Sequence, residues 1–178
     1  MADSGPDTLH WYVAYVKSCQ EKKTAEALGR LGLEYFLPIQ KVRRKWSDRF
    51  KDVDQILIRG MIFIHCKDAD RYRILEQVVP LYAFMTDRAT GKTGSAAVAI
   101  IPDAEMNSFM FMVGHAGGSV RISTERFSPG DKVRITEGPL SGLECEVIKV
   151  DGQKTAIVRL GALGSALVNL SLDTIHKV

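Results

Sequence analysis

Hydrophobic and polar positions divide this chain into two parts that have different periods. From Trp11 to Val113, short apolar runs alternate with helix-like stripes, whereas from Phe127 onward only short strand-like runs remain, separated by glycines. Between them, the segment GHAGGSVRISTER at 114–126 has three glycines and no helical stripe, as in a linker or a loosely held strand. The pattern predicts an α+β domain over 9–114, a linker over 115–126 and an all-β domain over 127–178.

The first part predicts a four-stranded, mostly antiparallel sheet. Its strands are expected at 11–16, 34–38, 56–66 and 82–86, where aromatic and β-branched residues are concentrated. The third run, ILIRGMIFIHC, is interrupted at Gly60, where we expect a bend, a bulge or a close backbone approach.

Three helices are expected in the same part. The first follows Ser18, because residues 18–21 have the Ser-x-x-Glu form of a capping box. The second is capped by Asp68, and the apolar face that we expect it to bury consists of Tyr72, Leu75 and Val79. The third has Pro102 in its first turn, and its apolar stripe consists of Met106, Phe109, Met110 and Val113.

The second part predicts a small barrel. Five short strands are expected at 132–136, 143–150, 155–160, 166–170 and 172–176. A meander of ~50 residues without a helix can bury a core and hide its edges only by curling, so we expect an SH3-like barrel.

Composition and charge narrow the class of protein without identifying a partner. The chain has 178 residues, 46% of them hydrophobic and 25% charged, which is ordinary for a globular protein, and its net charge is only +3. Its three cysteines are widely spaced with no Cys-x-x-Cys pair, which disfavours a disulfide framework and a zinc site. The start of the chain lacks the features of a signal peptide, and no apolar run reaches the ~20 residues of a membrane span. We expect a cytoplasmic protein without a metal or cofactor.

The strongest local charge bias is in KVRRKWSDRFK at 41–51, between two predicted strands. Its cations and interleaved aromatics are Lys41, Arg43, Arg44, Lys45, Trp46, Arg49, Phe50 and Lys51, against Asp48 alone. On a hairpin tip, such cations can neutralise phosphates and an exposed aromatic can stack on an unpaired base. The alternative is a solvated loop with one buried tryptophan.

Large apolar residues exceed what one face of the predicted sheet requires. They include Trp11, Tyr12, Val13, Tyr15, Ile58, Met61, Phe63 and Phe84. If helices cover only one face, the other exposes an apolar patch that marks a partner site. If both faces are covered, these residues are core.

Catalytic chemistry has little support. His65 and Cys66 are neighbours on a predicted strand, so their side chains point to opposite faces and one cannot deprotonate the other. We expect both to be structural, and no catalytic residue is predicted.

Residues 127–152 resemble a KOW motif, which consists of a glycine-aspartate turn, a strand, a Gly-Pro-x-x-Gly loop and a second strand. The match is carried by Gly130, Asp131, Val133, Gly138, Pro139 and Gly142. Preceded by WYVAYVKSCQEKKTAEAL, FLP, GMIFI and IPDAEM, in this order and spacing, the motif makes nearly the whole chain similar to the NusG family of transcription elongation factors.

The resemblance implies an N-terminal NGN domain that binds the clamp helices of RNA polymerase and a C-terminal KOW domain. By motif position, the polymerase-binding depression would be lined by Tyr15, Ile58, Met61, Phe63 and Phe84. RfaH-type paralogues touch the polymerase gate loop through a His-Thr-Thr element at the start of the second helix, where this chain has Tyr72 and Arg73. The basic segment falls where family members approach upstream duplex and non-template DNA.

The resemblance also favours a specialised paralogue over a housekeeping factor. Leu140 follows Gly-Pro where housekeeping NusG normally has an aromatic residue, and Cys145 occupies a usual glycine position. These departures are closer to the UpxY and RfaH types, so we expect action on particular long operons such as capsular polysaccharide operons, with ribosomal protein NusE or Rho as a partner of the KOW domain. The alternatives are housekeeping NusG and a KOW-type RNA-binding or ribosome-associated protein.

Overall fold

The computed structural model describes residues 8–87, 97–117, 119–170 and 175–177. The chain forms two compact units. The first contains Met1–Leu37 and Ile58–Asp103, and the second contains Pro38–Leu57 and Ala104–Val178.

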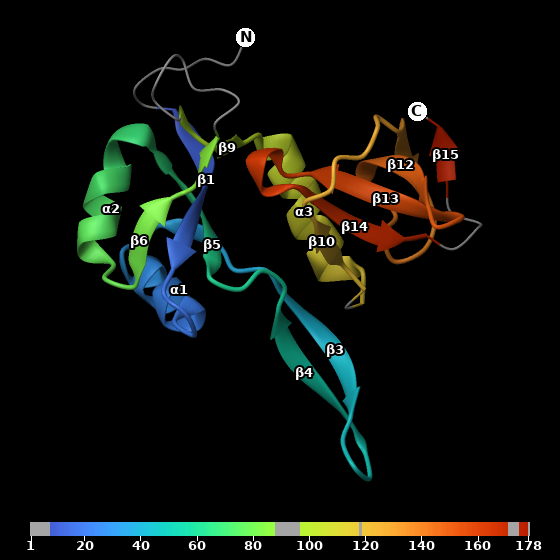
Figure 1. Ribbon diagram of the computed structural model, residues 1–178, viewed down its shortest axis with the longest axis horizontal. Helices are drawn as coiled ribbons and strands as arrows, with labels where there is room; N and C mark the ends of the chain where they lie inside the picture. Colours follow the sequence, from blue (N-terminus) through green and yellow to red (C-terminus); the bar gives the residue numbers. More distant parts are fainter. Residues whose placement is uncertain (1–7, 88–96, 118, 171–174, 178) are drawn as a thin grey trace. The chain divides into compact units, whose positions relative to one another are not determined.

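The first unit is built on an antiparallel sheet in the order β2-β5-β1-β6 (Figure 1). Its strands are β1 (Leu9–Val16), β2 (Glu34–Phe36), β5 (Met61–Lys67) and β6 (Leu81–Phe84), and β9 (Ile100–Ile101) also pairs with β1. A separate two-stranded ladder joins β7 (Thr86–Asp87) to β8 (Ala97–Val98). The helices are α1 (Glu21–Arg30), the short 3-10 helix η1 (Asp68–Asp70) and α2 (Arg71–Gln77).

Helices α1 and α2 cover one face of this sheet. Alternate residues of β1 and β5 pack with Leu28 of α1 and Ile74 of α2 in one hydrophobic cluster. The predicted apolar face of the second helix is right for Leu75, which packs partly buried against this cluster, and wrong for Tyr72 and Val79, which are each 73% exposed; Ile74 and Val78 are buried instead. The helix begins at Arg71 and has only two turns, so its inner face is set by Ile74.

The capping box predicted at Ser18 is also wrong. Helix α1 begins at Glu21 after Gln20, and no side chain caps it; instead the Thr24 hydroxyl donates to the Gln20 carbonyl at 2.8 Å. The Glu21 carboxylate accepts a hydrogen bond from the Gly60 N–H, 39 positions along the chain. Gly60 has φ of +72°, and the run predicted as one bent strand is divided there, because β4 ends at Ile56 and β5 begins at Met61.

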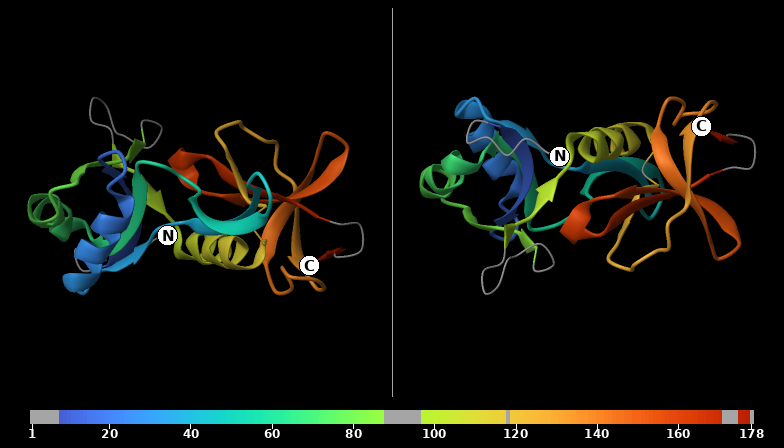
Figure 2. Two further views of the ribbon diagram at one scale, coloured as in Figure 1. Left: turned by 90° about the horizontal axis from the view of Figure 1, so that it is seen from below. Right: turned by 90° about the horizontal axis from the view of Figure 1, so that it is seen from above.

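The second unit contains a hairpin, a helix and a twisted antiparallel sheet (Figure 2). The hairpin pairs β3 (Ile39–Lys45) with β4 (Phe50–Ile56), and helix α3 (Asp103–His115) lies in this unit from Ala104 onward. The sheet has the order β10-β14-β13-β12-β11-β15. Its elements are β10 (Arg121–Ser123), β11 (Asp131–Ile135), β12 (Glu144–Val150), β13 (Gln153–Arg159), η2 (Gly161–Leu163), β14 (Ser165–Asn169) and β15 (Ile175–Lys177).

The fold class is the predicted one, an α+β part followed by an all-β part. The predicted stripe of α3 is nearly right: Met106, Phe109 and Val113 are buried, but Met112 is buried in place of Met110. The segment 115–126, predicted as a linker or a loosely held strand, contains β10, which pairs with β14.

Candidate nucleic-acid and partner interfaces

The basic segment forms the distal half of the β3–β4 hairpin, a two-stranded ribbon (Figure 1). Trp46 and Arg49 close its tip: the Trp46 N–H donates to the Arg49 carbonyl at 2.8 Å, and the Arg49 N–H donates back at 3.3 Å. From Arg43 to Asp52 every side chain along the ribbon is exposed. The predicted hairpin is confirmed.

On one face of the ribbon, basic residues lie opposite acidic residues of the partner strand. Lys41 lies opposite Asp54 and Arg43 opposite Asp52 in the ladder, and directly paired residues share a face. Toward the tip, the Arg43 guanidinium lies over the Phe50 ring, 5.2 Å from its centroid. The charge on this face is therefore partly balanced within the ribbon.

The other face carries two cations directly opposite each other. Arg44 pairs with Lys51, and the next pair on the same face is Val42 with Val53. Two like charges directly opposite each other destabilise a ladder. Because neither cation has a carboxylate opposite it, the pair presents uncompensated positive charge to which an anion can bind. The residues of 41–51 do not predict this contrast between the faces, because Asp52 and Asp54 follow that segment in the sequence.

Both aromatic residues near the tip are exposed, Trp46 by 61% and Phe50 by 60%. The alternative that the tryptophan is buried is therefore wrong. An exposed indole beside cations has the geometry needed to stack on an unpaired base.

On the first unit, the structure brings together part of the expected polymerase-binding set. Tyr15 pairs with Met61 across β1 and β5, and both side chains are partly exposed. The Tyr15 ring stacks on Tyr82 at 5.8 Å between centroids, and Tyr82 is 59% exposed. Ile58, 9% exposed, lies in the segment that leads into β5. Tyr82 was not predicted for this surface, because its position depends on a register shift between β1 and β6 after Tyr15.

Phe63 and Phe84 are placed differently from our expectation. Phe84 pairs with Ala14 and packs against the Tyr12 ring, so it belongs to the helix-covered face. Phe63 is 0% exposed and lies 6.2 Å from Phe36 between ring centroids. Phe63 pairs with Val13 and therefore lies on the same sheet face as Tyr15 and Met61, but its side chain is buried there, whereas Phe84 lies on the opposite, helix-covered face.

Tyr72 and Arg73 lie in the first turn of α2 and are both exposed. The Arg73 Nη2 is 3.0 Å from Asp70 Oδ1, and the Tyr72 ring has the Arg71 guanidinium 5.8 Å from its centroid. Both side chains are accessible to a partner.

The KOW residues shape the turns of the second unit. A side chain at Gly130 would place its Cβ 2.5 Å from the Val147 carbonyl oxygen, and the Gly130 N–H donates to Glu146 at 3.0 Å. Asp131 begins β11, and Val133 within it is 3% exposed. The Arg159 guanidinium donates to both oxygens of Glu146, at 2.9 and 2.8 Å.

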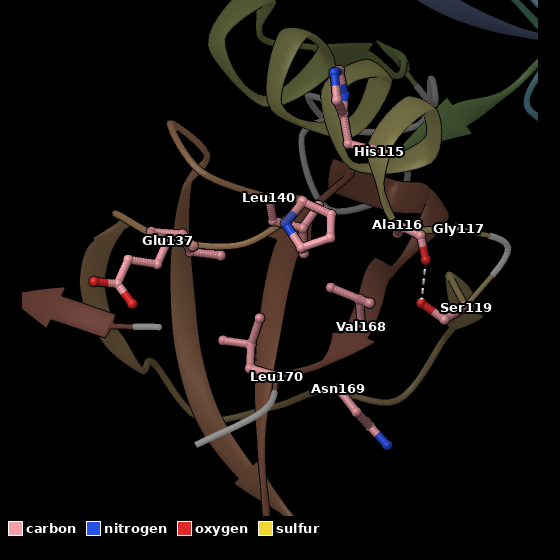
Figure 3. A pocket seen from close by; sticks show the side chains of 11 residues that line it. His115, Ala116, Gly117, Ser119, Glu137, Leu140, Val168, Asn169 and Leu170 are labelled. Carbon is pink, nitrogen blue, oxygen red and sulfur yellow. Dashed lines mark hydrogen bonds between the residues drawn. The ribbon is translucent and has the colours of Figure 1, made fainter. Parts of the chain in front are cut away.

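The Gly-Pro-x-x-Gly loop borders a small cavity. Gly138 and Gly142 have φ of +80° and +95°, and the Gly142 N–H donates to the Ile135 carbonyl at 2.7 Å. The cavity measures about 300 Å³, and Pro139 and Leu140 line it together with Val168 and Leu170 of the β14 region (Figure 3). Leu140, at the position where housekeeping NusG was expected to have an aromatic residue, is 7% exposed and forms part of this wall.

His65 and Cys66 lie on opposite faces, as predicted. The His65 ring stacks on Trp11 at 4.8 Å, and its Nδ1 is 2.6 Å from Glu34 Oε2. Cys66 belongs to the helix-covered core, where burial raises the pKa of its thiol to about 12. This thiol stays protonated at neutral pH, which does not suit a nucleophile.

The family follows from two sequence matches. Residues 9–110 match the family model described as "Transcription termination factor nusG", and residues 129–160 match that of the KOW motif. The chain belongs to the NusG family. Proteins of the NusG family are non-enzymatic transcription factors that bind RNA polymerase, so the chain has a general role in transcription elongation.

Solved structures of NusG and Spt5 proteins are similar to this chain over nearly its full length. The structure described as "Domain interaction in Thermotoga maritima NusG" is 17% identical with a TM-score of 0.48, and the match covers 96% of this chain and 98% of that one. The structure of the MjSpt4:Spt5 complex in conformation A is 14% identical with a TM-score of 0.29, covering 94% and 97% of the two chains. No curated protein matches this sequence. Among the described residues, no helix is long and apolar enough to cross a membrane.

Proposed function

We propose that this NusG-family protein promotes processive transcription by binding the clamp helices of RNA polymerase through the surface formed by Tyr15, Met61 and Tyr82. The observation that supports the proposal is the partly exposed aromatic pair, Tyr15 on Tyr82, next to Met61. Exposed aromatic and methionine side chains are enriched at protein interfaces. A factor that binds the closed clamp better than the open one shifts polymerase toward the closed state, and this requires no chemistry.

The hairpin supplies the second contact in this proposal. Arg44 and Lys51 bind phosphates of upstream or non-template DNA, and Trp46 stacks on an unpaired base of the transcription bubble. Its exposed positive face and exposed indole support this assignment. Tyr72 and Arg73, exposed on α2, contact the polymerase gate loop.

The remaining parts of the proposal concern organisation and specialisation. Residues 9–114 act as the polymerase-binding domain, 115–126 as the linker, and 127–178 as the KOW domain that recruits NusE or Rho. The residue types at Leu140 and Cys145, which depart from the housekeeping pattern, support a specialised factor that serves particular long operons such as capsular polysaccharide operons. If deletion of the gene for this protein lowers expression of one long operon, the result supports a specialised factor. A general loss of expression would favour a housekeeping factor.

Capture of core RNA polymerase by the full-length chain tests the polymerase contact. Tyr15→Ala is expected to lower the affinity at least tenfold, because it removes both the aromatic pair and the neighbour of Met61. Tyr35→Ala is the matched control, since Tyr35 is a partly exposed tyrosine of the same sheet, opposite Ile64 on the helix-covered face. Equal affinity of Tyr15→Ala and the wild type, with both folded, would reject the proposed surface.

A further inference from the structure

Glu21 is the only charged side chain that is buried among the residues the structure describes, with 5% of its surface exposed. Burying a carboxylate costs free energy unless hydrogen bonds or charges compensate for lost water. Glu21 is the first residue of α1, where the positive end of the helix dipole favours a negative charge. Its carboxylate also accepts the Gly60 N–H at 2.8 Å.

This hydrogen bond fixes one side of a turn that is held on its other side by the backbone. The Gly60 carbonyl accepts from the Val16 N–H at 2.8 Å, so both peptide groups of Gly60 are bonded, one to the end of β1 and one to α1. Gly60 has φ of +72°, a region that glycine enters and leaves without steric cost. Without Glu21, the Gly60 N–H would lose the acceptor that the structure gives it, while the bond from Val16 would remain.

The turn lies next to the proposed polymerase surface. Ile58 lies two residues before Gly60, and Met61 follows it and pairs with Tyr15. We infer that Glu21 is a positioning residue for the polymerase contact: it acts through the Gly60 N–H to fix the turn that places Ile58 and Met61 beside Tyr15. This inference rests on the proposed function, and Glu21 itself touches no polymerase atom.

Two substitutions separate positioning from general stability. Glu21→Gln keeps an acceptor oxygen of the same shape, whereas Glu21→Met keeps the volume and removes the acceptor. Thr24→Val is the matched control, because Thr24 is fully buried in the same helix and its hydroxyl donates within that helix, to the Gln20 carbonyl. Polymerase affinity of the full chain, corrected for the folded fraction from thermal unfolding, is measured together with hydrogen exchange of the Gly60 amide.

In Glu21→Met, the Gly60 amide is expected to exchange with solvent at least tenfold faster than in the wild type, and polymerase is expected to bind at least fivefold more weakly. In Glu21→Gln and Thr24→Val, both quantities are expected to stay within twofold of the wild type. Wild-type affinity of folded Glu21→Met, or equal weakening by all three variants, would overturn the inference. Tyr15→Ala, measured in parallel, shows whether a negative result contradicts only the role of Glu21 or also the proposed polymerase-binding surface. If Tyr15→Ala loses affinity and Glu21→Met does not, only the inference fails; if Tyr15→Ala also binds normally, the proposed surface fails as well.

Discussion

Arg44 and Lys51 lie directly opposite each other in the β3–β4 ladder, whereas Arg43 and Lys41 on the other face lie opposite aspartates. The two faces of one hairpin therefore differ in how much of their positive charge is free to meet a phosphate. Because a like-charge pair in register destabilises the ladder, the pair on this exposed ribbon is better explained by anion binding than by a contribution to folding stability.

Removing the opposed pair should weaken DNA binding more than removing the balanced cations. We expect Arg44→Ser combined with Lys51→Ser to lower affinity for duplex and bubble DNA and to reduce the salt dependence, log K against log salt, by about two units in magnitude. Lys41→Ser combined with Arg43→Ser removes the same net charge and serves as the control. Titrations at several salt concentrations would contradict the assignment of faces if the control variant lost as much affinity and slope.

The tip tryptophan should distinguish single-stranded from duplex DNA. Trp46→Ala is expected to cost about 1–3 kcal/mol in binding a single-stranded oligonucleotide, because one base loses its stacking partner, with a much smaller effect on duplex. The side chain is 61% exposed, so thermal stability should hardly change. Trp46→Phe should recover part of the loss; an equal loss on both DNAs, or none, would count against stacking.

Gly130 should tolerate no side chain. A Cβ there would lie 2.5 Å from the Val147 carbonyl oxygen and 2.6 Å from an Ile148 methyl carbon, so Gly130→Ala is expected to destabilise its unit by about 1–3 kcal/mol. A Cβ at Gly114, in helix α3, would have no described atom within 4 Å apart from its own helix backbone and chain neighbours, so Gly114→Ala should be neutral or stabilise by up to about 1 kcal/mol. Denaturant unfolding of both variants checks the pair. A Gly130→Ala protein as stable as Gly114→Ala would show that the turn can shift to admit the methyl group.

Local patterns were sufficient for most elements. The aromatic and β-branched residues at 11–16 predicted β1, and the spacing of Met106, Phe109 and Val113 predicted most of the buried stripe of α3. The continuous apolar run reflects a strand whose two faces are both largely buried, and the spaced stripe reflects a helix that is buried on one face. The run of cations at 41–51 likewise predicted an exposed hairpin, because charged side chains are rarely buried.

Features that depend on pairing between distant residues could not be predicted. Glu21 has the spacing of a capping box, yet its carboxylate bonds Gly60 because the tertiary fold brings that N–H within reach. Tyr82 joins Tyr15 only through the register of β6 on β1. The contrast between the faces of the hairpin likewise requires the register that sets Asp52 opposite Arg43.

The pair formed by Glu146 and Arg159 should make the stability of the second unit depend on pH. Hydrogen bonds from Arg159 lower the pKa of the Glu146 carboxyl, helped by the Gly130 N–H and opposed by partial burial. A carboxyl whose pKa is lower in the folded state stabilises that state fully above its unfolded pKa, ~4.3 for glutamate, and loses this contribution as the pH falls through the folded value. Stability should therefore fall on acidification.

Glu105 contributes with the opposite sign and has to be removed from the comparison. Burial, and then the Glu146 charge, raise the pKa of the Glu105 carboxyl, so its protonation on acidification stabilises the folded state. In a Glu105→Gln background, we expect Glu146→Gln to cost about 1–3 kcal/mol at neutral pH, where charge-assisted hydrogen bonds from Arg159 are lost, and the difference between the two proteins to shrink as the pH falls below the unfolded pKa of glutamate, ~4.3. Denaturant midpoints measured between about pH 3 and 7 provide the test. Parallel curves across that range would mean that the ionised form of Glu146 is not what stabilises the fold.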